Sequence, residues 1–286
     1  MADEKIKEIA KQVDELRGAC PLMHCITNVV TVHECANAAL AVGASPIMAN
    51  EEAEAEEITS IASSLIVNIG TLTKSQINTM KISTKTAGEL NKKFVLDPVG
   101  IGVSQIRNDT AIDLIKLNTP TIIRGNLSEI KAIATFYGIL EECSQVKGVD
   151  VAEGDVINEE TLEYNSELIR NIAAKLETTV AVSGKIDIIS DGKEVYAVDN
   201  GDAVLSSITG TGCMLATIMG AYAAVTTPLN AAICATLVMT ISGEIAAEKM
   251  RKNDEGTGSF NVYLTDEFYK MTPETMMKYA NLKKVL

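Results

Sequence analysis

The chain has 286 residues, which is enough for one large α/β domain with a full hydrophobic core, and it shows no linker or low-complexity stretch. We therefore expect residues 1–286 to form a single domain. The formal net charge is −13 and the lysines and arginines are scattered, which argues against a nucleic acid as partner.

Cysteine usage and the N-terminal residues predict a cytoplasmic protein. The chain begins Met-Ala-Asp-Glu-Lys, with no basic segment followed by an apolar one, so no signal peptide is visible. The cysteines form no C-x-x-C pair and no dense framework, as expected for reduced thiols. They stand at positions 20, 25, 35, 143, 213 and 234.

Residues 3–17 have the pattern of an amphipathic surface helix, and short apolar runs then alternate with helical patterns. Strands are predicted at Leu22–Ile26, Pro46–Ala49, Leu65–Ile69, Phe94–Pro98, Thr121–Ile123 and Thr179–Val182. Helices are predicted near 32–42, 52–62, 74–92, 107–117 and 127–135. This alternation predicts an α/β fold with a mostly parallel sheet and helices on both faces.

The pattern changes after the strand at Thr179–Val182. Ile186–Ser190 and Glu194–Val198 flank an Asp-Gly turn and predict a hairpin, which would form an antiparallel edge of the sheet. The preceding segment, 136–158, is polar and irregular, and a helix is expected from about residue 159 to 177. From Thr211 onward the chain is predicted to be nearly all helix.

Residues 203–243 contain no charged side chain, so a membrane span must be considered. Pro228 divides the stretch into pieces shorter than the ~20 residues of a spanning helix, and Asn230 and several Ser and Thr residues interrupt it. We expect two buried helices and no membrane association, with the first running from Thr211 to about Ala224.

In an open parallel sheet the ligand crevice lies beyond the carboxyl ends of the strands. Residues that immediately follow strands, most of them polar, are therefore expected to share one edge of the sheet. They are Asn28, Met48, Asn50, Gly70, Thr71, Asp97, Arg124, Asn126 and Ser183.

The segment Ile208–Cys213 (Ile-Thr-Gly-Thr-Gly-Cys) has two glycines where a loop leads into a helix. The first amides of a helix have no intrahelical acceptor, and with the helix dipole they suit a phosphoryl group. Gly210 and Gly212 would let an anion approach the backbone closely. The spacing is neither the dinucleotide motif nor the P-loop, so a purely structural turn packed on a neighbour is the alternative.

Asp97 ends an apolar strand, directly before Pro98, where it could hold Mg²⁺ through water molecules or simply cap a turn. After the next strand, Arg124 offers a planar fork for phosphate oxygens. Asn126 and Glu129 would share the first helical turn, either in phosphate and metal binding or as a capping box. These two roles can coexist, because the cap would orient the carboxylate.

Cys213 at a helix start is expected to have a lowered thiol pKa, so it could accept a proton from a substrate hydroxyl or position that hydroxyl. The alternative is a small buried side chain. His24-Cys25 and His33-x-Cys35 form a His/Cys cluster, but their spacing does not bring four zinc ligands together on a strand or a helix. Core or crevice-lining roles are favoured for them.

Taken together, these residues resemble the hydroxyethylthiazole kinase family, a branch of the ribokinase-like superfamily. The resemblance covers nearly the whole chain, and its last motif is the most specific, because most ribokinase-like enzymes have Asp in place of Cys213. The matching motifs are Cys25-Ile26-Thr27-Asn28, Gly43-Ala44-Ser45-Pro46-Ile47-Met48, Asn68-Ile69-Gly70-Thr71, Asp97-Pro98-Val99-Gly100, Arg124-Gly125-Asn126 with Glu129, Ser183-Gly184 and Thr209-Gly210-Thr211-Gly212-Cys213.

The resemblance implies a ribokinase-like fold and ATP-dependent phosphorylation of the hydroxyl of 4-methyl-5-(2-hydroxyethyl)thiazole, in thiamine biosynthesis or salvage. It implies Mg²⁺ as cofactor, with Asp97 and Glu129 at the metal. Arg124, Ser183 and Asn126 would bind ATP; Ser183 replaces a more usual Thr and keeps the hydroxyl.

The resemblance further implies thiazole contacts from Met48, Gly210 and Asn28, and a homotrimer with active sites between subunits. Gly210, Thr211 and Gly212 would stabilise charge on the transferred group, with Cys213 beside the attacking hydroxyl. The alternatives are a ribokinase-like kinase for hydroxymethylpyrimidine or a sugar, and a nucleotide-binding regulator without turnover.

Overall fold

The computed structural model describes residues 2–140 and 157–286, and the strands in these residues form one sheet. The order across the sheet is β2-β1-β3-β4-β5-β6-β7-β8-β9, in which β1 to β6 run parallel and β6 to β9 pair antiparallel. The strands are β1 (Leu22–Ile26), β2 (Ser45–Ile47), β3 (Ser64–Asn68), β4 (Lys93–Asp97), β5 (Ile122–Asn126), β6 (Thr179–Ser183), β7 (Asp187–Ser190), β8 (Val195–Val198) and β9 (Leu282–Lys284).

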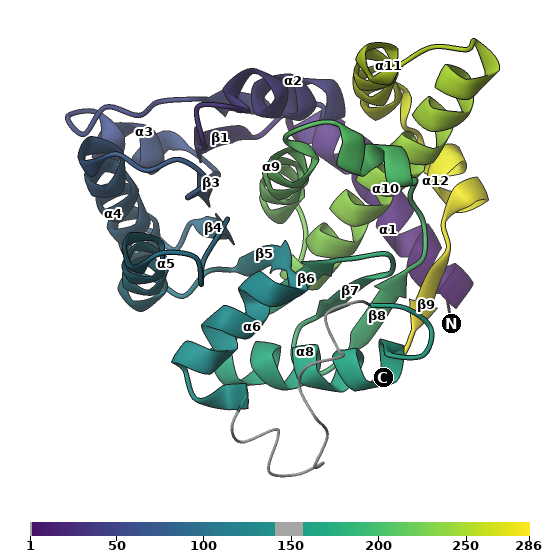
Figure 1. Cartoon of the computed structure of the whole chain (residues 1–286). Helices are drawn as coiled ribbons and strands as arrows, with labels where there is room; N and C mark the ends of the chain where they lie inside the picture. Colours follow the sequence, from purple (N-terminus) through teal and green to yellow (C-terminus); the bar gives the residue numbers. More distant parts are fainter. Residues whose placement is uncertain (1, 141–156) are drawn as a thin grey trace.

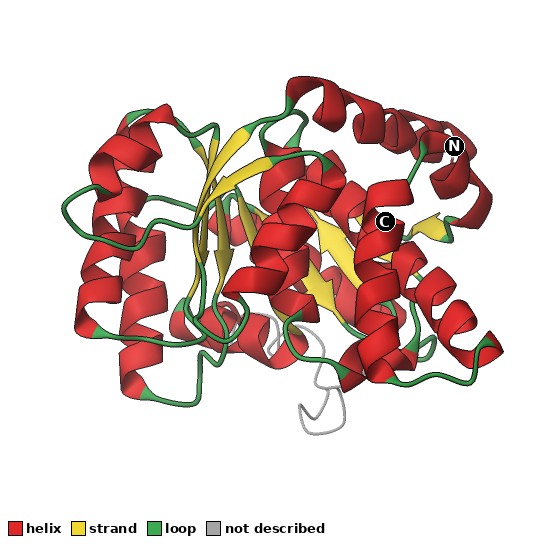
Figure 2. Ribbon diagram, turned by 90° about the horizontal axis from the view of Figure 1, so that it is seen from above, coloured by secondary structure: helices red, strands yellow, loops and turns green. Residues whose placement is uncertain are grey.

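Helices cover both faces of this sheet, and Figure 2 shows the strands between two layers of helices. One layer contains α4 (Lys74–Glu89), α5 (Gln105–Leu117), α6 (Leu127–Phe136) and α8 (Leu162–Leu176). The other contains α1 (Ala2–Ala19), α2 (Val32–Val42), α9 (Thr211–Ala223), α10 (Pro228–Lys252), α11 (Thr257–Lys270) and α12 (Pro273–Tyr279). The short α3 (Ala55–Ile61) packs against α4 and β1 (Figure 1). The fold class expected from the sequence is confirmed.

Alternating side chains of the central strands divide the core into two halves. In β4, Phe94 and Leu96 belong to the core under α4, α5, α6 and α8, whereas Val95 packs on the side of α9. Phe94, Val95 and Leu96 are consecutive apolar residues because both faces of a parallel sheet are buried. This is why the central strands were visible in the sequence as continuous apolar runs.

Most predicted elements are observed with shifts of one to three residues at their ends. β1 and α2 have the predicted bounds, and the hairpin of β7 and β8 is antiparallel as predicted. β5 extends to Asn126, so Arg124 belongs to the strand itself. Only residues 136–140 and 157–158 of the segment predicted to be irregular, 136–158, lie within the described residues.

β9 (Leu282–Lys284) was not predicted and pairs antiparallel with β8. Its three residues include two lysines, so no apolar alternation marks it as a strand. It exists because the edge of β8 offers free backbone groups to which the chain end can pair.

The two helices expected in the uncharged stretch are α9 and α10. By length and composition, α10 is the one described helix that could cross a membrane, but 89% of its apolar window is buried inside the protein. α9 packs closely on the sheet: a Cβ added at Gly220 would lie 2.2 Å from Cγ1 of Ile66 on β3. A glycine is therefore required at this contact.

Candidate active site

The start of α9 meets the carboxyl ends of β1, β3, β4 and β5. Cys213, in the first turn of α9, accepts hydrogen bonds at Sγ from Nδ2 of Asn28 (3.1 Å) and Nδ2 of Asn68 (3.2 Å). Nδ2 of Asn68 also donates to Oδ2 of Asp97 over 2.6 Å. These groups come from three different strand ends and one helix, so the predicted convergence at one edge holds for Asn28 and Asp97.

Asp97 is fully buried in this network. Burial raises the pKa of its carboxyl to about 7, the charge of Arg124 opposes the rise, and the charge of Glu129 adds to it. Its Oδ1 atom accepts no hydrogen bond from the described residues, and the nearest cationic group is Nη1 of Arg124 at 3.7 Å. Asp97 therefore has one oxygen held by an amide and one still free for a cation.

Arg124 lies between this carboxylate and α9. Its Nη2 donates to Oγ of Ser183 over 2.8 Å, which joins the two residues expected to bind ATP. A Cβ at Gly212 would lie 2.5 Å from Nη1 of Arg124. The absence of a side chain at 212 thus allows the guanidinium to lie against the first turn of α9.

Glu129 and Asn126 form the capping box that was one of the two alternatives. The Asn126 side chain accepts from the amide of Glu129 (2.9 Å), and Oε2 of Glu129 accepts from the amide of Asn126 (2.8 Å). Oε1 of Glu129 accepts from the amide of Gly100 over 2.8 Å. Each carboxylate oxygen keeps a further lone pair, so the cap leaves Glu129 able to bind a cation.

The thiol of Cys213 corrects one expectation. A helix start was expected to lower its pKa, but burial and the neighbouring charge of Asp97 raise it, against hydrogen bonds from Thr31, Asn28 and Asn68 that lower it. Burial destabilises the thiolate by more than the start of the helix stabilises it. Cys213 is consequently a thiol at neutral pH.

The turn before α9 depends on a glycine at 210. Gly210 has φ +89°, in the left-handed region, and a Cβ there would lie 2.7 Å from Cγ2 of Thr31. Its carbonyl accepts the first helical bond, from Met214. The amides of residues 211, 212 and 213 precede that bond and so have no acceptor within the helix.

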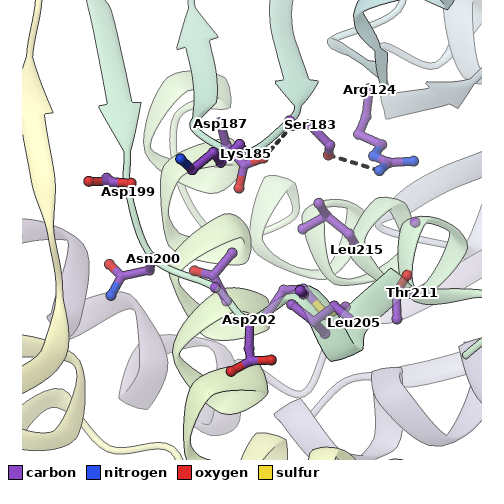
Figure 3. A pocket seen from close by; sticks show the side chains of 16 residues that line it. Arg124, Ser183, Lys185, Asp187, Asp199, Asn200, Asp202, Leu205, Thr211 and Leu215 are labelled. Carbon is purple, nitrogen blue, oxygen red and sulfur yellow. Dashed lines mark hydrogen bonds between the residues drawn. The ribbon is translucent and has the colours of Figure 1, made fainter. Parts of the chain in front are cut away.

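A pocket of about 560 Å³ opens beside Arg124 and Ser183. Figure 3 shows these two side chains meeting at one side, with Thr211 and Leu215 of α9 and the carboxylates of Asp187, Asp199 and Asp202 around it. The pocket is lined by Arg124, Ser183, Gly184, Lys185, Asp187, Asp199, Asn200, Gly201, Asp202, Ala203, Leu205, Thr211, Gly212, Leu215, Met239 and Thr240.

Other crevice residues from the sequence lie around this centre without a direct contact to Cys213. Gly70 donates from its amide to Oδ1 of Asn68 (2.8 Å), and Thr71 accepts at Oγ1 from the amide of Val29 (3.0 Å). Met48 is half-buried against the core on the α9 side. Asn50 is exposed and takes no part in the network.

The two histidines of the His/Cys cluster have separate partners and surroundings. The imidazole of His24 is hydrogen bonded to Oγ1 of Thr59 (2.8 Å) and to the carbonyl of Ala49 (3.1 Å), while Cys25 and Cys35 are buried in the core on the α9 side. His33 is paired with Asn37 one helical turn further along α2. Core roles therefore account for His24, Cys25 and Cys35.

Asn68 and Asp187 belong to the site but were given no role from the sequence, where Asn68 was named only within the motif Asn68-Ile69-Gly70-Thr71. Asn68 was counted inside the apolar strand predicted at Leu65–Ile69, although one amide in such a run is itself a signal. Asp187 accepts from the amide of Gly184 (2.9 Å), and burial raises the pKa of its carboxyl to about 7. It opens a hairpin strand, where a polar residue usually faces solvent, so nothing in the sequence distinguished it.

Comparisons with known proteins identify the family of the chain. The profile of the "Hydroxyethylthiazole kinase family" matches residues 13–274. The chain is 60% identical to hydroxyethylthiazole kinase 1 of Methanosphaera stadtmanae, over 100% of both chains, and 42% identical to hydroxyethylthiazole kinase of Pyrococcus furiosus, over 97% of this chain and 98% of that one.

Solved structures show the same likeness. The structure of hydroxyethylthiazole kinase protein from Pyrococcus horikoshii has a TM-score of 0.85 at 36% identity and covers 98% of this chain and 100% of that chain. A ribokinase-like superfamily protein from Enterococcus faecalis shares the fold, with a TM-score of 0.62 at 13% identity over 96% of each chain. With matches of this extent and identity, the chain belongs to the hydroxyethylthiazole kinase family.

Proposed function

We propose that the chain transfers the γ-phosphoryl group of ATP to the hydroxyl of 4-methyl-5-(2-hydroxyethyl)thiazole. The observation that carries the proposal is the meeting of Cys213, Asp97 and Arg124 at the first turn of α9. A thiol beside a free carboxylate oxygen, a guanidinium and unpaired helix amides suits a hydroxyl attacking a phosphoryl group. The names of the full-length relatives specify the thiazole alcohol.

ATP is proposed to lie in the pocket beside Arg124 and Ser183, with its phosphates toward α9 and within reach of Asn126. The guanidinium offers paired N–H donors to phosphate oxygens, and Gly212 leaves room for a close approach. The amides of residues 210–213 would stabilise charge on the group in transfer.

Mg²⁺ is proposed to be held by Asp97 and Glu129. The fit rests on the buried Oδ1 of Asp97, which has no partner among the described residues, and on the spare lone pairs of Glu129. No group of three or more His, Cys, Asp or Glu that could hold a metal occurs in residues 2–140 and 157–286. Water and ATP phosphates would complete the shell, as Mg²⁺ prefers, and the ion would neutralise charge on those phosphates.

Cys213 is proposed to position the substrate hydroxyl. Because burial raises its pKa, the thiol is protonated at neutral pH and is poorly suited to remove a proton. The hydroxyl oxygen would form the new bond to the γ-phosphorus as the bond to the β–γ bridging oxygen breaks and ADP leaves. A loose transfer of this kind asks little of a base, so the hydroxyl proton can pass to the transferred phosphoryl oxygens.

The thiazole ring is proposed to contact Met48, Gly210 and Asn28, at a site completed by a neighbouring subunit of a homotrimer. Exposed apolar side chains in the loop after β1 support an interface: Val29 and Val30 are 69% and 60% exposed. Apolar groups of this size at one edge favour association. Sedimentation equilibrium would give three times the mass of the chain, and a stable monomer with full activity would contradict the proposal.

The activity is tested by ATP consumption with a panel of alcohols. Purified protein with Mg²⁺ and ATP is expected to release ADP only when the thiazole alcohol is added, with lower kcat/KM for hydroxymethylpyrimidine and for sugars. Preference for one of those would favour the related kinase activity. Nucleotide binding with no alcohol-dependent ADP release would favour a regulator in the same fold. We also propose that residues 1–286 act as one domain, which the continuous sheet supports. A cytoplasmic location is proposed as well, because the free thiols of Cys20, Cys25, Cys35, Cys213 and Cys234 are typical of a reducing compartment.

A further inference from the structure

Asn68, the last residue of β3, lies between Asp97 and Cys213 in the proposed site. It is 1% exposed, and β3 sets it opposite Asp97 in the parallel register with β4. It is not among the residues proposed to contact ATP, Mg²⁺ or the thiazole, and it is shielded from solvent. Its amide is nevertheless the group that joins Asp97 to Cys213.

Every hydrogen-bonding capacity of this amide is used. Its Oδ1 accepts from the amide of Gly70 (2.8 Å) and from Nδ2 of Asn28 (3.1 Å). Its Nδ2 donates to Oδ2 of Asp97 (2.6 Å) and to Sγ of Cys213 (3.2 Å). A side-chain amide has two donor hydrogens and two acceptor lone pairs, so it has nothing left for a ligand.

The orientation of the amide is determined by the backbone. The N–H of Gly70 can only donate, so the atom that it contacts must be the Asn68 oxygen. The nitrogen is then directed to Asp97 and Cys213. The same nitrogen holds one carboxylate oxygen and one sulfur, and it leaves Oδ1 of Asp97 free on the side of Arg124.

We propose that Asn68 is the positioning residue of the transfer, which holds the hydroxyl-orienting thiol of Cys213 and the cation-binding carboxylate of Asp97 in one fixed arrangement. This proposal rests on the proposed function. Without the amide, Asp97 and Cys213 would each lose a donor and could rotate independently, and a small displacement of aligned groups costs much of the rate of a positioned reaction.

The kinetic test is a double-mutant cycle between Asn68→Ala and Cys213→Ala. In the wild-type background Asn68→Ala is expected to lower kcat by about tenfold to a hundredfold with the KM for ATP within about twofold. In the Cys213→Ala background the same change should lower kcat by a smaller factor than in the wild type, because only the hold on Asp97 is then left to lose. Equal effects in the two backgrounds, or an unchanged kcat, would overturn the proposal.

Asn230→Ala is the matched control for loss of a buried amide. Asn230 is 5% exposed, donates to Glu8 and accepts from Lys5, and lies on α10 away from the site. Its removal should lower the melting temperature and leave kcat unchanged. If Asn68→Ala does not fold, Asn68→Ser, whose hydroxyl can accept from the amide of Gly70, takes its place in the same cycle.

Crystal structures of the wild type and of Asn68→Ala provide a second readout that does not depend on activity. The proposal expects the side chains of Asp97 and Cys213 to take new orientations when the amide is absent, and unchanged orientations would overturn it. A wild type with no alcohol-dependent ADP release would instead contradict the proposed function, and the kinetic role of Asn68 with it.

Discussion

Cys213 receives two amide hydrogen bonds and has a raised thiol pKa, which together describe a group that accepts and orients. Asp would accept the same bonds from Asn28 and Asn68 at this position. Phosphoryl transfer is therefore expected to depend on the position of the Cys213 side chain more than on its basicity.

Cys213→Ala is therefore expected to lower kcat by about tenfold to a hundredfold without abolishing turnover, and Cys213→Asp should retain activity. Steady-state ADP release at saturating thiazole alcohol measures both. Cys20→Ser, at an exposed cysteine after α1, is the control and should have no effect. Complete loss of activity in a folded Cys213→Asp protein would contradict this role.

Gly212 matters through its contact with Arg124. The single methyl of Gly212→Ala would lie 2.5 Å from Nη1, so the guanidinium must move away from α9. We expect the KM for ATP to rise and kcat to fall by about tenfold or more, because the phosphate clamp is displaced.

Gly258→Ala is the matched control, since a Cβ at Gly258 in α11 meets nothing within 4 Å. Initial rates over a series of ATP concentrations would separate the two effects. A Gly212→Ala protein with wild-type kinetics would show that the reaction does not require Arg124 to lie against the first turn of α9.

At the scale of elements, the middle of α9 packs directly on the sheet. This contact places the first turn of α9 at the site. Gly220 of α9 permits this, since a Cβ there would lie 2.2 Å from Cγ1 and 2.5 Å from Cδ1 of Ile66. Alanine normally favours a helix over glycine by about 1 kcal/mol, so an exposed site would gain from the change.

Gly220→Ala is instead expected to lower the free energy of unfolding by about 1–3 kcal/mol, because the added methyl overpacks the contact with β3. Urea denaturation measures the change. In the Ile66→Ala background the same substitution should cost less than in the wild type, since the opposing side chain has been shortened. A stabilised Gly220→Ala protein would disprove the close contact.

At the scale of the whole molecule, buried carboxyls connect the site to the pH dependence of stability. Burial raises the pKa of Asp187 to about 7, from an ordinary value of 3.8, although the amide of Gly184 and the charge of Arg124 oppose the rise. Between these two pH values the folded chain binds more protons than the unfolded chain. The stability due to Asp187 is therefore greatest below pH 4 and is lost as the pH rises through 7.

Asp187→Asn is expected to remove the loss of stability at high pH that is due to Asp187, because an amide does not ionise. Its oxygen can still accept from the N–H of Gly184. At pH 8 the variant should be more stable than the wild type by up to about 4 kcal/mol, and near pH 4 the two should be equal. Chemical denaturation at several pH values tests this. The exposed Asp254→Asn provides the control for the same change in charge, and equal shifts in both variants would contradict the prediction.

Much of the site was predictable because the patterns that mark it are local. Asp97 and Arg124 could be selected from their place at the ends of apolar strands, and Gly210 and Gly212 from their place before an uncharged helix. The capping box of Asn126 and Glu129 was likewise visible as a spacing of three residues, and the structure contains it.

The sequence by itself determined where most strands and helices lie and which end of the sheet carries the chemistry, because burial on both faces imposes apolar runs and turns demand particular residues. Only the tertiary structure decided the direction of the Cys213 pKa shift, the role of Asn68 between Asp97 and Cys213, and the pairing of β9 with β8. These three depend on desolvation, on hydrogen bonds between residues far apart in the chain, and on a free strand edge. Such properties arise when the elements pack together and leave no periodic trace in the residues themselves.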